Sequence, residues 1–352
     1  MDSFGAFPMD GNIVFSEGLI MKRSCSLVAF VFLAIHTVTA HAGTITFGSP
    51  GNLFTMEFVS IGNPGNAADT TGTPAAVGSV GYTYAIGKYE ISRDMITKYN
   101  ANFGTTNSLV IALADMTPYG GNGSNKPASG ASWNEAARFV NWLNTSSGGY
   151  AAYKFTSNGV NDNIALWTTA DILDYDTSNP YRSKRARFAL PNYHEWYKAA
   201  YYDPASSTYF DYPSVNGLTP TPVSGGTVDN TAVYFQPGPS GPAAIDNAGG
   251  LSRYGVMALG GNIREWEESS FDLQNNNGAS IRAIRGGTWF DGPGYLSSSE
   301  RYNDAATTDK NLTVGFRVVM LSSGTEVPEP STFIIGSLLG LGAFMGRRKS
   351  KR

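Results

Sequence analysis

The chain has 352 residues, of which only 15% are charged and 12% are aromatic, and its formal net charge is −3 at pH 7. This balance argues against nucleic-acid binding, which requires clustered lysine and arginine. The only cysteine, Cys25, excludes a disulfide framework, so we expect an aromatic core to hold the fold.

Residues 1–42 are predicted to be an N-terminal extension with a secretory signal peptide. Basic Lys22 and Arg23 precede an apolar run over residues 27–35, and the segment ends in the A-x-A pattern that signal peptidase cleaves. We therefore expect export and a mature chain that begins at Gly43.

The mature chain is predicted to open with strands and loops and then to continue with capped helices. Residues 84–92 have the pattern of a strand that ends at Ser92, a suitable N-cap for a short helix. A longer helix is predicted after Ser132, because Glu135 completes a capping box and apolar side chains follow at helical spacing.

A third helix is predicted after a strand that ends at Pro191. Asn192 is its expected cap, and Glu195 and Trp196 are interpreted as a buried polar anchor and a core aromatic residue. Residues 201–252 are rich in Gly, Pro, Ser, Thr and Asn without periodicity, and we predict that they form loops.

Three blocks of glycine and aromatic residues follow, at residues 260–266, 285–289 and 315–319. The paired glycines of the first two blocks are expected where φ is positive or where a β-carbon would clash. The order of the blocks, with the segments before them, resembles the formylglycine-generating enzyme (sulfatase-modifying factor) superfamily over residues 82–321. This resemblance implies an α+β fold of the C-type lectin-like kind, low in regular structure, for a domain over residues 43–322.

The enzymes that name this superfamily bind copper through two cysteines shortly after the second block, and residues 289–301 contain none. Asp and Ser oxygens do not favour Cu(I), so we expect neither copper nor formylglycine-generating activity. A sister branch uses an iron centre with several histidine ligands, but His194 is the only histidine after the predicted signal peptide. We interpret His194 as a helix-start or surface residue, with a lone catalytic base as the alternative.

The resemblance also implies two places for structural calcium, a cation that prefers six to eight oxygen ligands. Both sites have fewer ligands than usual in this sequence, because residues that usually supply carboxylate or amide oxygens are missing. Ala258, for example, stands where Asn or Asp is usual. The alternative to calcium binding at the first place is that Glu265, the glutamate of the first block, is a buried, hydrogen-bonded carboxylate. The implied ligands are the carbonyls of Gly261 and Ile263 with the carboxylate of Glu265, and, at the second place, Asn230 and Thr231.

The loops around the glycine–aromatic blocks are the predicted binding surface. Aromatic and charged residues there could recognise an extracellular glycan or peptide, which favours a non-catalytic binding or structural protein. The alternative is an enzyme of the superfamily with altered active-site chemistry, such as an oxidoreductase whose cysteine function is replaced. The candidate surface residues are Trp266, Trp289, Asp291, Glu300 and Arg301.

Residues 323–352 are predicted to be a sorting signal. Pro-Glu-Pro at residues 328–330 precedes an apolar run over residues 331–346, and a basic cluster closes the chain. This order resembles the PEP-CTERM signal of Gram-negative bacteria, which an exosortase is thought to cleave. It implies transient insertion in the inner membrane and delivery to the cell envelope or extracellular matrix, with a permanent membrane anchor as the alternative.

Overall fold

The structure, a computed structural model, describes residues 43–74 and 76–321. The predicted signal peptide, its Cys25 and the predicted sorting signal lie outside the described residues. Within the described range, no helix combines the length and the apolar character needed to cross a bilayer.

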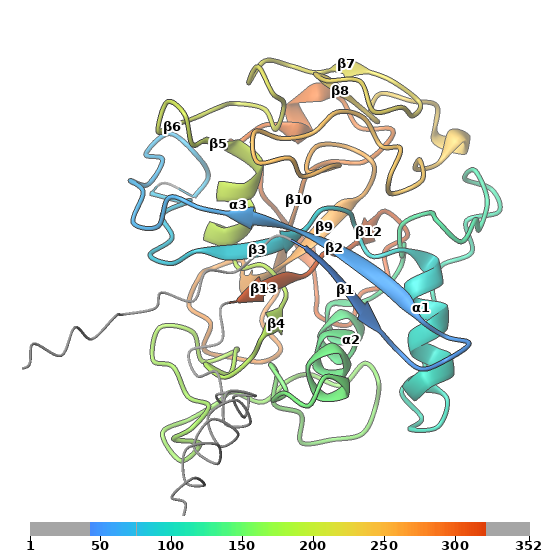
Figure 1. Ribbon diagram of the computed structural model, residues 1–352, viewed down its shortest axis with the longest axis vertical. Coiled ribbons are helices and arrows are strands. Elements are labelled where there is room, and N and C mark those ends of the chain that lie inside the picture. Colours follow the sequence, from blue (N-terminus) through green and yellow to red (C-terminus); the bar gives the residue numbers. More distant parts are fainter. Residues whose placement is uncertain (1–42, 75, 322–352) are drawn as a thin grey trace, which may run out of the picture. The chain divides into compact units, whose positions relative to one another are not determined.

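An antiparallel sheet of five strands brings the first and last strands of the described chain into one layer. The strands are β1 (Gly43–Phe47), β2 (Phe54–Ile61), β3 (Tyr84–Gly87), β4 (Phe188–Ala189) and β13 (Val319–Leu321). They are arranged in the order β1-β2-β3-β13-β4, so the last strand lies between β3 and β4 (Figure 1). Buried and exposed side chains alternate along the first half of β2, as expected for a strand with one face on the core.

A second sheet of four strands contains the glycine–aromatic blocks. Its strands are β9 (Arg264–Ser270), β10 (Arg282–Arg285), β11 (Tyr302–Ala305) and β12 (Val314–Gly315), in the order β11-β10-β9-β12. Strand β9 pairs antiparallel with β10 and parallel with β12. Six of its seven residues are buried although its sequence is polar, so its side chains must find partners inside the protein.

The helices begin where the predicted caps stand. They are α1 (Arg93–Tyr99), continued by a π-helical turn η1 (Asn100–Gly104), α2 (Trp133–Ser146) and α3 (Tyr193–Tyr201). The Ser92 side chain accepts a hydrogen bond from the backbone of α1, and both Ser132 with Glu135 and Asn192 with Glu195 form complete capping boxes. All three predicted N-caps are therefore confirmed.

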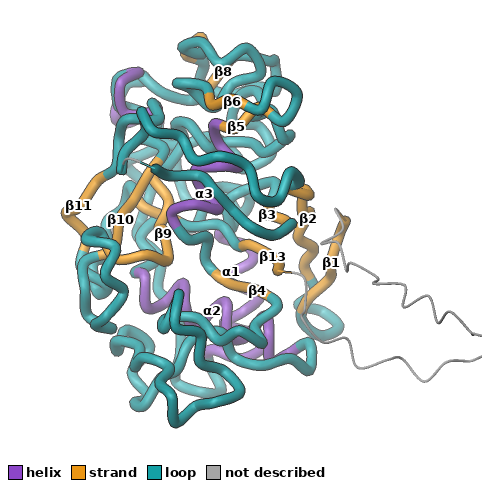
Figure 2. The backbone as a smooth tube through the Cα atoms, turned by 90° about the vertical axis from the view of Figure 1, so that its left-hand side faces the viewer, coloured by secondary structure: helices purple, strands orange, loops and turns teal. Residues whose placement is uncertain are grey.

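Loops account for most of the remaining chain (Figure 2). The short elements between them are β5 (Tyr202–Asp203), β6 (Thr208–Tyr209), β7 (Thr221–Pro222), β8 (Thr231–Ala232), η2 (Gly238–Ser240) and η3 (Pro293–Leu296). Residues 201–252, predicted as loops, thus contain the end of α3 and two-residue strands but little other regular structure. An α+β fold with low regular content is confirmed.

Large aromatic side chains fill the interior, among them Trp133, Trp196, Trp266 and Trp289, each fully buried. The paired glycines allow the backbone to approach this core closely. At Gly261 φ is +84°, and an added β-carbon would lie 2.3 Å from the Val233 carbonyl oxygen. The expectation of positive φ at the glycine pairs is confirmed there and at Gly287, where φ is +74°.

Candidate functional site

Strand β9 carries three fully buried carboxylates, and each of them meets an arginine. An unpaired buried charge is strongly destabilising, so this pairing explains how so polar a strand can lie in the interior. The pairs, measured from the arginine Nε, are Glu265–Arg317 at 2.6 Å, Glu267–Arg285 at 2.6 Å, Glu267–Arg301 at 2.9 Å and Glu268–Arg182 at 2.7 Å.

The segment after the second glycine block is organised by Asp291. Its Oδ2 accepts hydrogen bonds from the Thr288 backbone N–H at 2.9 Å and from Arg264 Nη2 at 2.8 Å. Asp291 is 7% exposed, so this ion pair is largely withdrawn from water. Arg264 Nε and Thr288 Oγ1 are buried and have no hydrogen-bond partner in the described part of the chain.

Four of the five predicted surface residues have buried side chains, Asp291 among them. The indole N–H of Trp266 donates to the Ala131 carbonyl at 2.9 Å, and that of Trp289 donates to the Gly238 carbonyl at 2.8 Å. The Arg301 side chain is 3% exposed and pairs with Glu267. A recognition surface therefore cannot include these two rings or this guanidinium, because their polar atoms are engaged and their faces are packed.

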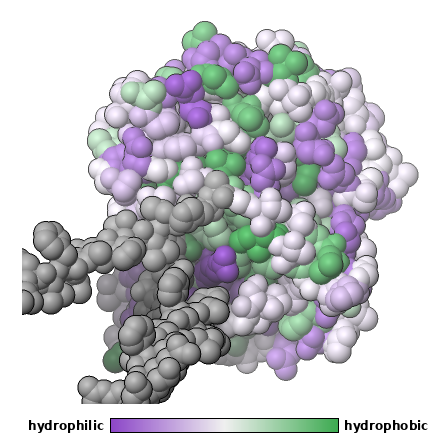
Figure 3. All heavy atoms as spheres, viewed as in Figure 1, coloured by the Kyte–Doolittle hydropathy of each residue, from purple (hydrophilic) through white to green (hydrophobic). Residues whose placement is uncertain are grey.

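Of the five predicted residues the surface keeps only the half-buried Glu300, and it gains aromatic residues that the sequence did not single out. Exposed hydrophobic residues are scattered over the face seen in Figure 3, which is ordinary for a globular protein. Three of them, however, adjoin one buried ion pair, that of Arg264 with Asp291. We call Phe235, Phe290 and Tyr295 the exposed aromatic trio; their exposed fractions are 70%, 42% and 40%.

Each residue of the exposed aromatic trio contacts a residue of the ion pair or is next to it in sequence. Phe290 directly precedes Asp291, and the Phe235 backbone N–H donates to the Asp291 carbonyl at 2.9 Å. The Arg264 guanidinium lies 5.8 Å from the Tyr295 ring centre. Phe235 also has a φ of +54°, an uncommon conformation for a bulky residue, and such strain gathers at functional sites.

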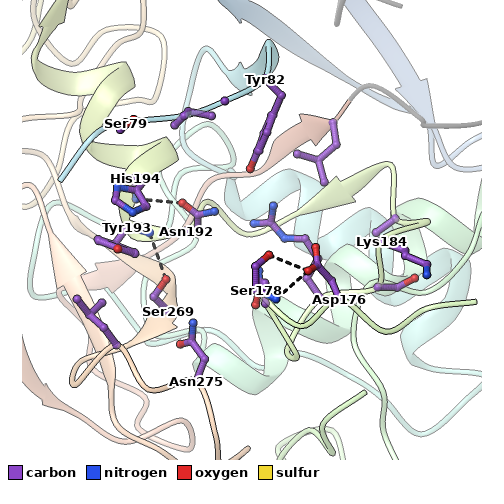
Figure 4. Close-up of a pocket in the computed structure, with 18 residues that line it drawn as sticks. Ser79, Tyr82, Asp176, Ser178, Lys184, Asn192, Tyr193, His194, Ser269 and Asn275 are labelled. Carbon is purple, nitrogen blue, oxygen red and sulfur yellow. Dashed lines mark hydrogen bonds between the residues drawn. The ribbon is translucent and has the colours of Figure 1, made fainter. Parts of the chain in front are cut away.

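A separate cleft of about 560 Å³ opens beside the start of α3 (Figure 4). Four segments that are distant in sequence line it, at residues 79–82, 176–186, 192–194 and 269–275, together with Leu321. Figure 4 shows Tyr82, Asn192 and Asn275 on different sides of one space. From the sequence, Asn192 was predicted as a helix cap and His194 as a helix-start or surface residue or a lone catalytic base, and the cleft was not predicted.

The cleft rests on a buried cluster of one arginine and two carboxylates. Arg182 Nη1 lies 2.9 Å from Glu195 Oε1, and Arg182 Nε lies 2.7 Å from Glu268 Oε1. Burial raises the pKa of Glu195, but Arg182 and hydrogen bonds from Tyr82 and Asn192 outweigh it and hold the pKa below its ordinary value. Burial and the neighbouring Glu195 instead raise the pKa of Glu268.

His194 lies in the first turn of α3, as predicted, and faces the cleft. Its Nδ1 accepts a hydrogen bond from the Gly78 backbone N–H at 3.0 Å, which leaves the ring proton on Nε2. Burial lowers the pKa of His194, so the neutral ring is favoured and Nε2 acts as a donor.

Residues 33–321 match the family model of the sulfatase-modifying factor enzyme 1-like domain. The chain belongs to this family. The match begins before the resemblance read from the sequence and includes β1 and β2. No curated protein matches the sequence.

Two solved structures share the fold of this family member. Treponema denticola variable protein 1 is 18% identical, with 80% of this chain and 99% of that chain covered and a TM-score of 0.53. CarF is 16% identical, with 75% of this chain and 98% of that chain covered and a TM-score of 0.51. At these identities the likeness shows the fold alone, and it confirms the predicted fold of the formylglycine-generating enzyme type.

The copper centre of the family's enzymes does not fit the residues present here. The segment that would carry the thiolates offers Asp and Ser oxygens, and Asp291 is already paired with the guanidinium of Arg264. A bound cation would have to displace that guanidinium without gaining a soft ligand. We therefore derive no chemistry through copper.

The side chains among the implied calcium ligands of this family member already have hydrogen-bond partners. Both Glu265 oxygens bind Arg317, and Trp196 Nε1 adds a bond of 2.8 Å, so Glu265 is the buried, hydrogen-bonded carboxylate of the alternative interpretation. Asn230 Oδ1 accepts from the Asn216 N–H, and the Thr231 hydroxyl donates to the Val228 carbonyl. Across residues 43–74 and 76–321 no group of three or more acidic, His or Cys side chains is placed to hold a metal ion.

Proposed function

We propose that this family member is an exported, non-catalytic binding protein of the cell envelope or extracellular matrix. The observation that carries the proposal is the Arg264–Asp291 ion pair, which occupies the segment where the family's enzymes have copper-binding cysteines. The signal-peptide pattern and the Pro-Glu-Pro tail support export through signal peptidase and an exosortase. The absence of a thiolate from residues 43–321 removes the oxidase chemistry and leaves recognition as the favoured role.

The exposed aromatic trio favours a peptide or protein segment as the ligand at this place. Aromatic residues and arginine are enriched at protein interfaces, where they supply most of the binding energy. Phe235 and Phe290 present apolar rings without polar atoms that could orient sugar hydroxyls. Phe235 combines an exposed side chain with a positive φ, as expected of a residue kept for contact at the expense of local strain.

A binding experiment with the full-length chain tests this proposal. A phage-displayed random peptide library is selected on the protein, and selected peptides are titrated against wild type and a Phe235→Ala/Phe290→Ala double variant. We expect the double variant to bind about tenfold more weakly or worse, since loss of one hot-spot ring removes about 1.4 kcal/mol or more. Val228→Ala, at a residue that is 70% exposed, is the matched control and should bind like wild type. Unchanged affinity in the double variant would rule out the trio as the contact surface.

A further inference from the structure

We propose that the cleft of Figure 4 is a second binding site, and that it takes an uncharged carbohydrate. Polar side chains with unused hydrogen-bonding atoms and two tyrosine rings surround one space there. These residues are distinct from the exposed aromatic trio, so this site and the proposed peptide surface can be tested independently.

The dimensions of the cleft suit one or two sugar rings. Its volume of about 560 Å³ lies within the range of small-ligand sites. Strand β13, which reaches the cleft at Leu321, lies between β3 and β4. An extended peptide could therefore not bind there by adding a strand to β13.

The charges of the cleft disfavour an ionic ligand. Arg182 is already paired with Glu195 and Glu268, so its guanidinium is neutralised from within the protein. At the rim, the Lys184 ammonium donates to the Ile172 carbonyl at 2.9 Å, and Asp176 Oδ1 accepts two hydrogen bonds from Ser178. An anionic ligand would therefore gain little from Arg182, and a cationic one would gain little from Glu195 and Glu268, whose oxygens already accept hydrogen bonds within the protein.

The cleft has both donors and acceptors that the protein itself does not use. Asn179 Oδ1 is buried and has no partner among the described residues. The amide nitrogens of Asn192 and Asn275 donate no hydrogen bond within residues 43–74 and 76–321, while their oxygens accept from the backbone at 2.9–3.0 Å. His194 Nε2 adds a further donor. A sugar hydroxyl both donates and accepts, so it matches this mixture better than a ligand with a single kind of polar group.

The tyrosine rings provide the apolar part of such a site. The Tyr82 hydroxyl donates to Glu195 Oε1 at 2.6 Å, and its ring packs edge-on against Tyr84, with centroids 6.2 Å apart. These contacts fix the ring although it remains 42% exposed. Tyr193 lines the opposite part of the cleft and is half-buried. A pre-positioned aromatic face can pack on the C–H face of a sugar while the amides bind its hydroxyls.

The test is an array of neutral gluco-, galacto-, manno- and xylo-oligosaccharides, with uronic-acid oligosaccharides for comparison, probed with the full-length chain. Hits are titrated by calorimetry against Tyr82→Ala, Tyr82→Phe and Asn275→Asp. The Asp replacement keeps the oxygen that accepts from Ser270 and puts a charged carboxylate oxygen, which can only accept, in place of the amide donor. Tyr150→Ala, at a tyrosine that is 53% exposed and outside the cleft, is the matched control.

We expect saturable binding of a neutral oligosaccharide, weakened about tenfold or more by Tyr82→Ala and by Asn275→Asp. Tyr82→Phe and Tyr150→Ala should remain close to wild type. The Phe235→Ala/Phe290→Ala variant should bind the sugar normally, so failure of this site and failure of the proposed peptide surface are distinguishable. If no neutral oligosaccharide binds, if only acidic ones bind, or if binding survives both Tyr82→Ala and Asn275→Asp, the inference is wrong. Asn275→Asp decides the outcome should Tyr82→Ala fail to fold.

Discussion

Replacing Arg317 with methionine should lower the free energy of unfolding by about 3–5 kcal/mol. Both Arg317 and its partner Glu265 are fully buried, and the replacement leaves the carboxylate with only Trp196 Nε1 as a donor. Two backbone carbonyls, of Gly87 and Met257, lose their donor as well. Each stranded polar group adds its own desolvation penalty. Urea unfolding at neutral pH measures the loss.

Two comparisons separate the buried charge from other effects of the Arg317 replacement. A double variant, Arg317→Met with Glu265→Gln, should be more stable than Arg317→Met alone, because the uncompensated charge is gone and Trp196 keeps an acceptor. Lys98→Met removes one partner of the exposed Lys98–Asp94 pair and should cost about 0.5 kcal/mol or less. Equal stability of Arg317→Met and wild type would contradict the assignment of this pair to the core.

Trp289→Ala should also destabilise the protein by about 3–5 kcal/mol. The ring is fully buried with Ile263 and Val233 in one core cluster, and its N–H donates to Gly238, so truncation leaves a cavity and removes one of the two hydrogen bonds to the Gly238 carbonyl. The neighbouring Phe290 gives a matched control, since its ring is 42% exposed. Phe290→Ala should change the unfolding midpoint much less and should act mainly on ligand binding.

A different result would assign Trp289 to ligand binding and not to the core. An unchanged unfolding midpoint in Trp289→Ala, together with loss of ligand binding, would show that the ring is a recognition residue, as the sequence had suggested. Thermal and chemical unfolding of Trp289→Ala and Phe290→Ala under the same conditions make the comparison direct.

The helix starts could be predicted because their signals are local. Ser132 and Glu135, three residues apart, form the predicted capping box; Asn192 caps its helix as predicted, and Glu195 completes a second box that was not predicted. The blocks around the glycine pairs could be placed for a similar reason, since only glycine tolerates the backbone at Gly261. Family resemblance then supplied the fold that joins these local elements.

The buried charges could not be predicted from sequence because their partners are remote. Arginine is ordinarily an exposed residue, and nothing near Arg317 in the sequence indicates that Glu265, 52 positions away, will meet it. The same holds for Arg301, which was predicted to lie on the surface and instead pairs with Glu267. Strand β9 is polar in sequence, and it can lie in the core because arginines from other segments pair with its three glutamates.

The cleft and the exposed aromatic trio were missed for a related reason. Asn179 and Asn275 are ordinary loop residues in the sequence, and only tertiary packing brings them to one space. Phe235 and Phe290 are separated by 55 positions and meet through backbone hydrogen bonds between loops. Loop-to-loop pairing has no periodicity, so pattern reading cannot find it.

The central claim is that this member of the family binds a ligand and does not carry out the family's oxidation. The most direct test incubates the full-length chain with copper, oxygen and a sulfatase peptide that contains Cys-x-Pro-x-Arg, with an active formylglycine-generating enzyme as the positive control. Mass spectrometry of the peptide should show the cysteine unchanged, because no thiolate exists in residues 43–321 and Asp291 is held by Arg264. Conversion to formylglycine above the level of a reaction without protein would contradict the account and restore the enzymatic alternative.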